Sequence, residues 1–567
     1  MKILGINFSN DAAAALLVDG RIVGALQEER ISRIKHDASF PARAIRWCLR
    51  EGGLTMADID AVGFFWNPGV HAQAPQGRMA ATTRDHLEYL YNVPVHLLRQ
   101  MDGRAVRRVE QVLHLDDGKR LPIHYLNHHE CHAAAAFYLS GFERSAVLTV
   151  DGYGERTATQ VARAQRGGAL EILKTIEFPH SVGSFYAAMT QYLGFEPNDG
   201  EGKVMGLASY GEPKYADLVR KLFFPTSDGF ELDLSYFCFF LPRPRRFTQK
   251  LVDLLGPQRQ PDSEITQHHM DMAASMQLVT EEILVHLARL ARQWSGETNL
   301  CMAGGVALNC VANTRIRQEA GFDGHYFMPA SSDAGTSLGA ALYVAHQLLG
   351  EPIERHPLID YWGPQYSAEH IESVLKVSGC TYTRPADIAE SAADLLAQSR
   401  IVGWFQGREE FGPRALGCRS ILADPRPAEM KDIVNARVKF REWFRPFAPA
   451  VLEEHVADFF EHGEVAPFML LVYPTRPDQV HNLAAVTHVD GGARVQTVTR
   501  EQNAPYYDVI AAFGRRTGVP VLLNTSFNIR GEPVVHTPQD ALKCFFTTDM
   551  DALALGPFLL EKSGKTA

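Results

Sequence analysis

The 567-residue sequence lacks an excess of basic residues, a cysteine framework and any long apolar run. Its formal charge of −10 gives no whole-chain basic surface of the kind that binds nucleic acid. The eight cysteines are scattered without a CxxC pair, which is typical of free thiols in a reducing compartment. No stretch approaches the roughly 20 apolar residues of a membrane helix, and the N-terminal apolar stretch is too short for a signal peptide. We expect a cytoplasmic protein that binds neither nucleic acid nor a membrane.

Length and composition indicate a globular chain of more than one domain. A chain of 567 residues is too long for one core, and its content of 46% hydrophobic and 22% charged residues is ordinary for a soluble protein. Residues 345–365 are rich in proline and turn-forming residues, which favours a boundary there. We therefore predict two α/β domains, residues 1–350 and 351–567.

Two segments of the first domain share a strand–turn–strand pattern. Residues 3–28 contain apolar runs separated by Asp19-Gly20, a dipeptide typical of hairpin turns. Residues 146–163 repeat the pattern about 145 residues later. This similarity predicts a duplicated α/β unit, and chance resemblance is the alternative.

Residues 126–155 contain a pattern that is typical of a metal site. His128 and His132 lie four residues apart in a helix-forming run, so both imidazoles face one side of a helix. An apolar strand then ends at Asp151, and Asp333 precedes a later run of small residues. Two imidazoles and two carboxylates suit a divalent ion. The alternative is a buried histidine pair without metal, which is the commoner meaning of an isolated HxxxH.

Glycine-rich turns in the same domain indicate nucleotide binding. Lys203 lies in Gly-Glu-Gly-Lys, which lacks the spacing and the hydroxyl residue of a Walker A motif. It could serve as a point charge for phosphate or be a solvated loop lysine. The turn after strand NLCMA, with Gly304, Gly305 and Asn309, would let backbone N–H groups approach a ligand, as would Gly152.

The second domain concentrates basic residues among glycines and aromatics. In an acidic protein this concentration favours bound phosphates, because guanidinium groups recognise them bidentately. The alternative is a set of surface arginines paired with nearby acids. The residues that we select for phosphate recognition or catalysis are Arg414, Lys439, Arg445, Arg494, Asn524 and Arg530.

Eight segments together resemble the O-carbamoyltransferases grouped with nodulation, cephamycin and tobramycin carbamoylation enzymes. They occur in the family's order and span nearly the whole chain, which makes the set specific. The segments are NHHECHAAAAFY, VDGYGE, EGKVMGLASYG, AGGVALN, SSDAGTSLGAA, GPRALGCRS, VKFREWFRPFAP and LNTSFNIRGEP.

This resemblance implies a duplicated actin/hexokinase-like ATPase fold in the N-terminal domain and a YrdC-like α/β domain at the C-terminus. It also implies that carbamoyl phosphate and ATP, accompanied by Mg²⁺, give carbamoyl-adenylate and pyrophosphate in the C-terminal domain. The N-terminal domain would then transfer the carbamoyl group to a hydroxyl of a small, often secondary, metabolite. Iron is the metal that the resemblance favours for the four ligands, and a homodimer is a family-level expectation.

One position departs from the family pattern. Members commonly have a histidine after the first strand, near the reacting carbamoyl group, where this chain has Asn10. Asparagine cannot accept a proton at physiological pH. Asp11 could take the role of base for the acceptor hydroxyl, another residue could supply it, or transfer could be weak.

Two other functions fit parts of the sequence. An ATPase or metabolite kinase of the same fold with a regulatory C-terminal domain would explain the first domain but not the second basic centre. A non-catalytic nucleotide sensor would explain Asn10 but not the basic set. The acceptor is not identifiable, and its specificity should lie in loops such as 66–105 and 228–262.

Overall fold

The computed structural model describes residues 1–68, 108–241, 244–352 and 354–562. The chain divides into two compact units. Unit 1 comprises Met1–Glu28 and Ala38–His356, and unit 2 comprises Glu29–Asp37 and Pro357–Ala567. The short segment Glu29–Asp37, which the predicted boundary at residue 350 assigns to the first domain, is therefore part of the second unit.

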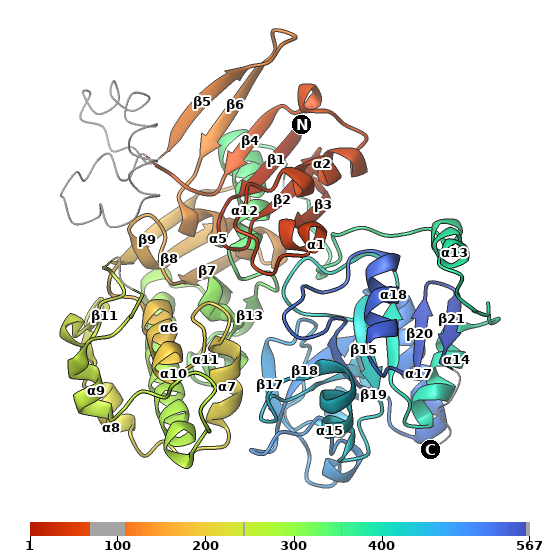
Figure 1. Ribbon diagram of the computed structural model, residues 1–567. Helices are drawn as coiled ribbons and strands as arrows, with labels where there is room; N and C mark the ends of the chain where they lie inside the picture. The colour runs from red at the N-terminus through yellow and green to blue at the C-terminus, as the bar shows by residue number, and fades with distance from the viewer. Residues whose placement is uncertain (69–107, 242–243, 353, 563–567) are drawn as a thin grey trace. The chain divides into compact units, whose positions relative to one another are not determined.

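Unit 1 contains two sheets with the same strand pattern (Figure 1). In each, three antiparallel strands are followed by two strands parallel to the first, in the orders β3-β2-β1-β4-β6 and β9-β8-β7-β12-β13. The shared order confirms the predicted duplication. The first sheet consists of β1 (Lys2–Asn7), β2 (Ala13–Val18), β3 (Arg21–Gln27), β4 (Ala61–Phe64), β5 (Val109–His114) and β6 (Arg120–Tyr125). The second consists of β7 (Arg144–Val150), β8 (Thr157–Gln165), β9 (Leu170–Glu177), β12 (Asn299–Ala303) and β13 (Gly324–Phe327), and β10 (Phe223–Thr226) and β11 (Gly229–Leu232) form a separate hairpin.

The two predicted strand–turn–strand segments are both present. Asp19 and Gly20 have φ of 49° and 78° between β2 and β3, as the tightest hairpin turns require. The second segment forms β7 and β8. Among its described residues, the helices of unit 1 are α2 (Ala42–Glu51), α5 (His128–Leu139), α6 (Val182–Tyr192), α7 (Glu201–Ala208), α8 (Ala216–Arg220), α9 (Gln249–Leu255), α10 (Gln267–Ser295), α11 (Cys310–Glu319) and α12 (Ala334–Tyr343).

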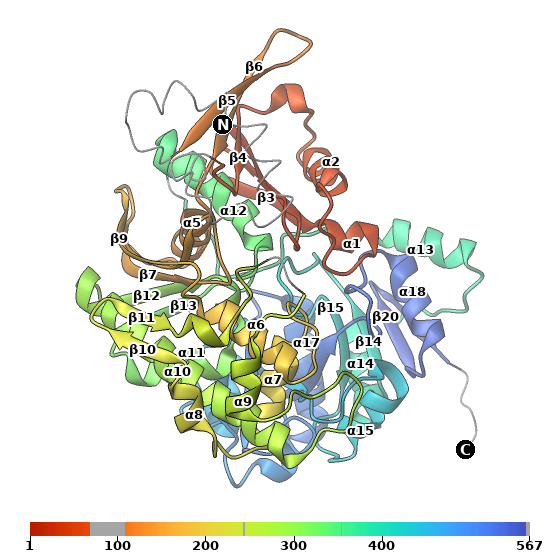
Figure 2. The same ribbon diagram turned by 60° about the vertical axis from the view of Figure 1, so that its left-hand side comes forward.

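Helices α5 and α12 pack unusually closely, and both views show them side by side (Figures 1 and 2). A Cβ atom on Gly339 of α12 would lie 1.9 Å from the carbonyl oxygen of Cys131 on α5. Only glycine allows this approach at position 339. The contact brings the start of α12 near the histidines of α5.

Unit 2 is built on one mixed eight-stranded sheet of order β17-β18-β16-β19-β15-β14-β20-β21. Its strands are β14 (Val402–Phe405), β15 (Arg419–Ala423), β16 (Ala448–Leu452), β17 (Leu471–Pro474), β18 (Gly492–Val498), β19 (Val521–Ser526), β20 (Ala552–Leu555) and β21 (Phe558–Glu561). Its helices are α13 (Ala368–Val377), α14 (Ile388–Ala397), α15 (Met430–Val434), α16 (Val456–Phe459), α17 (Ala504–Thr517) and α18 (Pro538–Thr547), and α1 (Glu28–Ser32) begins at the junction of the units. Trp404, Tyr506 and Phe513 are fully buried where α14 and α17 cover the sheet.

Two further observations concern the expected environment. All eight cysteines are free thiols, and seven of them are buried. Within the described residues, no helix has the length and apolarity that a membrane crossing requires.

Candidate active sites in the two units

Four side chains from three elements of unit 1 converge in a candidate metal centre. Two come from α5, Asp151 directly follows β7, and Asp333 directly precedes α12. The Nε2 atoms of His128 and His132 lie 3.1 Å apart and are 3.2 and 2.9 Å from Oδ2 of Asp151. Oδ1 of Asp333 lies 3.5 Å from His128 Nε2, and the four ligand atoms are all within 4.8 Å of one another. The predicted set is thus brought together.

The charges of these four residues are interdependent. Burial lowers the pKa of His128, but Asp333 and Asp151 outweigh burial and raise that pKa to about 9. Burial would raise the pKa of Asp151, but hydrogen bonds from both histidines hold it well below its usual value. The donor set fits a divalent ion, because two imidazoles and two carboxylates would share one positive charge centre in place of protons.

Surrounding residues orient the histidine helix. Burial raises the pKa of Glu155 to about 7, and its carboxyl group accepts hydrogen bonds from the backbone N–H groups of His128 and Asn67. His128 is the first residue of α5, so Glu155 satisfies an N–H group that the helix leaves open. His129 instead pairs with Thr149, its Nδ1 lying 2.7 Å from the hydroxyl oxygen, and is not among the converging ligands. No local pattern predicts this role of Glu155, which lies 27 residues from the helix start.

The predicted glycine turn lies against the end of β7. Gly304 has φ of 91°, and a Cβ there would lie 2.3 Å from the carbonyl oxygen of Val150. A Cβ on Gly305 would lie 3.2 Å from Oδ1 of Asp151. The same Oδ1 accepts a hydrogen bond from the N–H of Gly152. The turn and the four converging ligands are therefore neighbours within unit 1.

The other predicted nucleotide residues have protein partners. Lys203 lies on α7 rather than in a loop, and its Nζ donates to Asp199 at 3.2 Å. Asn309 caps α11 by accepting from Ala312 N–H, and it exchanges hydrogen bonds with Gln277 of α10.

The β1–β2 turn approaches the candidate metal centre at Ser9: burial raises the pKa of Asp333, and the neighbouring Ser9 hydroxyl opposes that rise. Asn10 is exposed, and Asp11 is half-buried with its carbonyl accepting from Asn7. Asn10 and Asp11 thus lie within two positions of a residue that affects the pKa of Asp333. Of the predicted specificity loops, 69–105 and 242–243 lie outside the described residues.

Unit 2 gathers most of its predicted cations into one cluster. Lys439 is buried and donates to Ser526 and to the carbonyl and side-chain oxygens of Asn528. Burial and the neighbouring Arg441 and Arg445 hold the pKa of Lys439 well below its usual value. Glu442 lies 3.6 Å from Arg445 and 3.8 Å from Arg530.

Arg441 is a member of this cluster that our selection from the sequence omits. Burial and the proximity of Arg445 and Arg494 hold its pKa well below the usual value. Its guanidinium also packs over the Phe447 ring, 4.3 Å from the centroid. The signal was available, because Arg441 lies in the same FREWFR run as Arg445.

Asn524 lies beneath the loop that carries Arg414, in the middle of the sheet. Its Nδ2 donates to the carbonyl of Ala415 and to Oε1 of Gln496, each at 3.1 Å. Gln496 in turn donates to the carbonyl of Leu416. Asn524 is 1% exposed, and its hydrogen bond to Ala415 supports this loop.

Comparison with known proteins gives consistent matches along the whole chain. The sequence model described as Carbamoyltransferase N-terminus matches residues 2–342, and Carbamoyltransferase C-terminus matches residues 393–562. An uncharacterized protein of Synechocystis sp. is 42% identical over 99% of this chain and 97% of its own length. Nodulation protein NolNO of Sinorhizobium fredii is 39% identical over 98% of this chain and 79% of its own length. A solved ROK hexokinase of Thermus thermophilus covers 60% of this chain and 98% of its own at 17% identity, with a TM-score of 0.28.

The chain thus combines a duplicated α/β unit, in which four possible metal ligands converge, with an α/β unit that holds a cationic cluster. The chain belongs to the carbamoyltransferase family, as the two family models and the identity to NolNO show. It is a transferase, and the family resemblance inferred from the eight sequence segments is confirmed.

Proposed function

We propose that the chain is an ATP-dependent O-carbamoyltransferase with two steps. In the first, carbamoyl phosphate, ATP and one water give carbamoyl-adenylate, pyrophosphate and orthophosphate in unit 2. In the second, an acceptor hydroxyl attacks the carbamoyl carbon in unit 1, AMP leaves, and the hydroxyl proton passes to a base. The acceptor is a small secondary metabolite.

The observation that carries this proposal is the cationic cluster of unit 2. Burial and neighbouring arginines hold down the pKa values of Lys439 and Arg441, and both side chains donate to neutral carbonyl and amide oxygens. A polyanion such as ATP with carbamoyl phosphate would relieve that repulsion and be held by charge-assisted hydrogen bonds. We assign Lys439, Arg445, Arg494 and Arg530 to phosphate binding, and Arg414 to the same site on its loop.

In unit 1, we assign His128, His132, Asp151 and Asp333 to one divalent ion, and iron is the ion that the family resemblance favours. Such an ion would act as a Lewis acid toward the adenylate phosphate. The residues around it would orient the nucleotide: Gly152, Gly304 and Gly305 by backbone approach, and Lys203 and Asn309 by side-chain contacts. Asp11 is the base that we propose for the acceptor hydroxyl, since Asn10 cannot accept its proton.

The test incubates purified protein with ATP, Mg²⁺ and carbamoyl phosphate without acceptor. We expect carbamoyl-adenylate by mass spectrometry and an equal amount of pyrophosphate. Arg445→Ala should lower both by about 100-fold or more, because it removes a cation from the site of developing charge, where one such donor is worth about 10²–10³ in rate. His128→Ala should still form the adenylate.

Arg500→Ala is the matched control, because Arg500 is 64% exposed and pairs with Asp508. It should match wild type. Formation of ADP and orthophosphate without adenylate would reject the proposal and favour a kinase or ATPase. Elemental analysis of wild type and His132→Ala tests the metal separately: one equivalent of iron should be present in the former and lost in the latter.

A further inference from the structure

The loop Gly412–Gly417, which carries Arg414, is fixed through its backbone by buried side chains. Oε1 of Glu410 accepts hydrogen bonds from the N–H groups of Leu416, Cys418 and Arg419, at 2.7, 2.7 and 3.2 Å. Glu410 is 1% exposed. One carboxylate oxygen therefore sets the conformation of the C-terminal end of the loop.

The other end of the loop is fixed at Gly412, through both its N–H and its carbonyl group. Its N–H donates to Oδ2 of Asp360 at 2.9 Å, and its carbonyl accepts from Nη2 of Arg30 at 2.9 Å. Arg30 comes from the segment Glu29–Asp37, some 380 residues away in sequence, which belongs to unit 2. Two distant segments thus determine where the loop begins.

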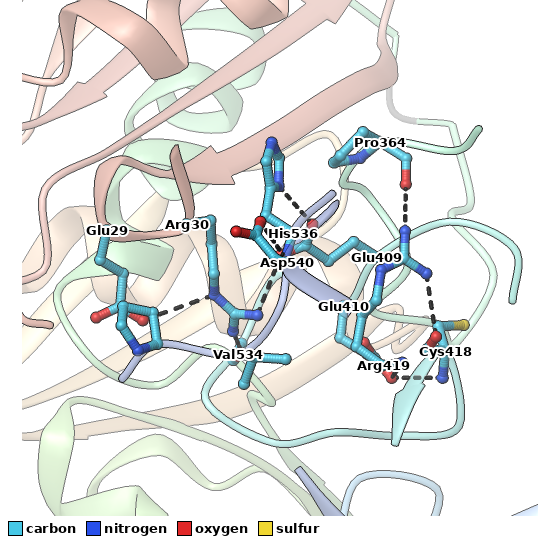
Figure 3. Close-up of polar contacts among 12 residues, drawn as sticks. Glu29, Arg30, Pro364, Glu409, Glu410, Cys418, Arg419, Val534, His536 and Asp540 are labelled. Carbon is cyan, nitrogen blue, oxygen red and sulfur yellow. Dashed lines mark hydrogen bonds and ion pairs between the residues drawn. The ribbon is translucent and has the colours of Figure 1, made fainter. Parts of the chain in front are cut away.

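Arg30 is itself fixed by a buried ion pair, drawn in Figure 3. Its Nη1 donates to Oε1 of Glu409 at 3.1 Å, and Oε2 of Glu409 pairs with Nδ1 of His536 at 2.7 Å. Arg30 is 2% exposed and Glu409 is fully buried. Burial would raise the pKa of Glu409, but His536 and Arg30 outweigh it and keep the carboxylate ionised.

The contacts of Arg30 require the planar fork of a guanidinium. Nη1 donates to a carboxylate and Nη2 to a carbonyl, and lysine, which has one nitrogen, cannot reproduce both nitrogen positions. The neighbouring Arg33 attaches the same segment elsewhere: it donates to the carbonyls of Val534 and Pro533 and lies near Asp540. A substitution at Arg33 therefore tests the attachment of the segment, whereas one at Arg30 tests the conformation of the loop.

We propose that Arg30 is a positioning residue for the phosphate site of unit 2: through the carbonyl of Gly412 it sets the loop on which Arg414 reaches the substrates. The loss of activity expected on changing Arg30 rests on the proposed adenylate-forming function. The change expected in the conformation of the loop does not. The test therefore uses two readouts on the full-length protein.

The first readout is hydrogen–deuterium exchange of peptides covering residues 411–419. In Arg30→Lys we expect these amides to exchange at least tenfold faster than in wild type, whereas Arg33→Lys should leave them within twofold. If Arg30→Lys is recovered unfolded, Arg30→Gln, which keeps one amide donor, takes its place. Unchanged exchange in Arg30→Lys, or an equal increase in Arg33→Lys, would overturn the inference whatever reaction the protein catalyses.

The second readout is pyrophosphate release from ATP and carbamoyl phosphate in a double-mutant cycle. Arg30→Lys should lower kcat/KM at least tenfold, and the Arg30→Lys/Arg414→Ala variant should lose no more than Arg414→Ala alone, because both act through one loop. Additive losses would show that Arg30 acts elsewhere and would reject its positioning role. If wild type releases no pyrophosphate, the proposed function fails while the exchange result still decides the inference.

Discussion

At the residue scale, we expect Asp360 to make the free energy of unfolding of unit 2 depend on pH, and a single substitution can test this contribution. Burial raises the pKa of this carboxyl to about 8, with Glu410 adding to the shift. The unfolded chain ionises Asp360 near pH 4, so between about pH 4 and 8 the folded state binds the additional proton. The free energy of unfolding should therefore fall as pH rises through this window, by up to about 1.4 kcal/mol per pH unit from this group.

Asp360→Asn removes the titration but keeps an oxygen to accept the N–H of Gly412. Urea unfolding of unit 2 at pH 5, 6, 7 and 8 should give a shallower loss of stability with rising pH in the variant than in wild type. Parallel curves would mean that Asp360 is ionised in the folded chain and that its burial does not govern its charge.

At the element scale, the turn after β12 depends on Gly304. Its φ of 91° and ψ of 155° lie in a region that is essentially restricted to glycine, at a cost of about 1–3 kcal/mol for other residues. A methyl group would also meet the carbonyl of Val150 at 2.3 Å. Gly304→Ala should thus destabilise unit 1 by about 3 kcal/mol or more, measured by denaturant unfolding.

Gly296 supplies the comparison for this prediction. It also has positive φ, 69°, at the end of α10, but a Cβ there meets nothing within 4 Å. Gly296→Ala should lower the free energy of unfolding by only about 1 kcal/mol, the cost of placing alanine in the left-handed conformation. Equal losses in the two variants would mean that the contact with β7 adds nothing.

Local patterns predicted elements well, because the determinants lie within a few residues. The spacing of His128 and His132, the strand ending at Asp151 and the Asp19-Gly20 turn all correspond to the structure. Glu155 was harder to predict, because its role depends on tertiary placement at a helix end. Asn524 lies on a predicted motif, but its contact with the loop at Ala415 depends on strand order, which no local pattern encodes.

At the scale of the whole molecule, the same limitation applies to the segment Glu29–Asp37, which groups with unit 2. Its sequence follows β3 without a linker, so continuity assigns it to the first domain. Its place in unit 2 depends on Arg30 pairing with Glu409, a contact across 379 positions. The C-terminal family model, residues 393–562, likewise excludes the segment.

A fragment of residues 357–567 should therefore be less stable than unit 2 in the intact chain. Without Arg30, Glu409 keeps His536 at Oε2 but loses the cation at Oε1, and removing a partner from a buried ion pair costs at most about 3–5 kcal/mol. Fusing residues 28–38 ahead of Pro357 through a flexible linker should recover most of that free energy of unfolding. The same fusion carrying Arg30→Gln should not recover this free energy, because it restores the segment 28–38 without the positive charge of Arg30. Chemical denaturation of the three proteins measures the difference, and a fragment as stable as its fusion would show that the segment is dispensable for folding.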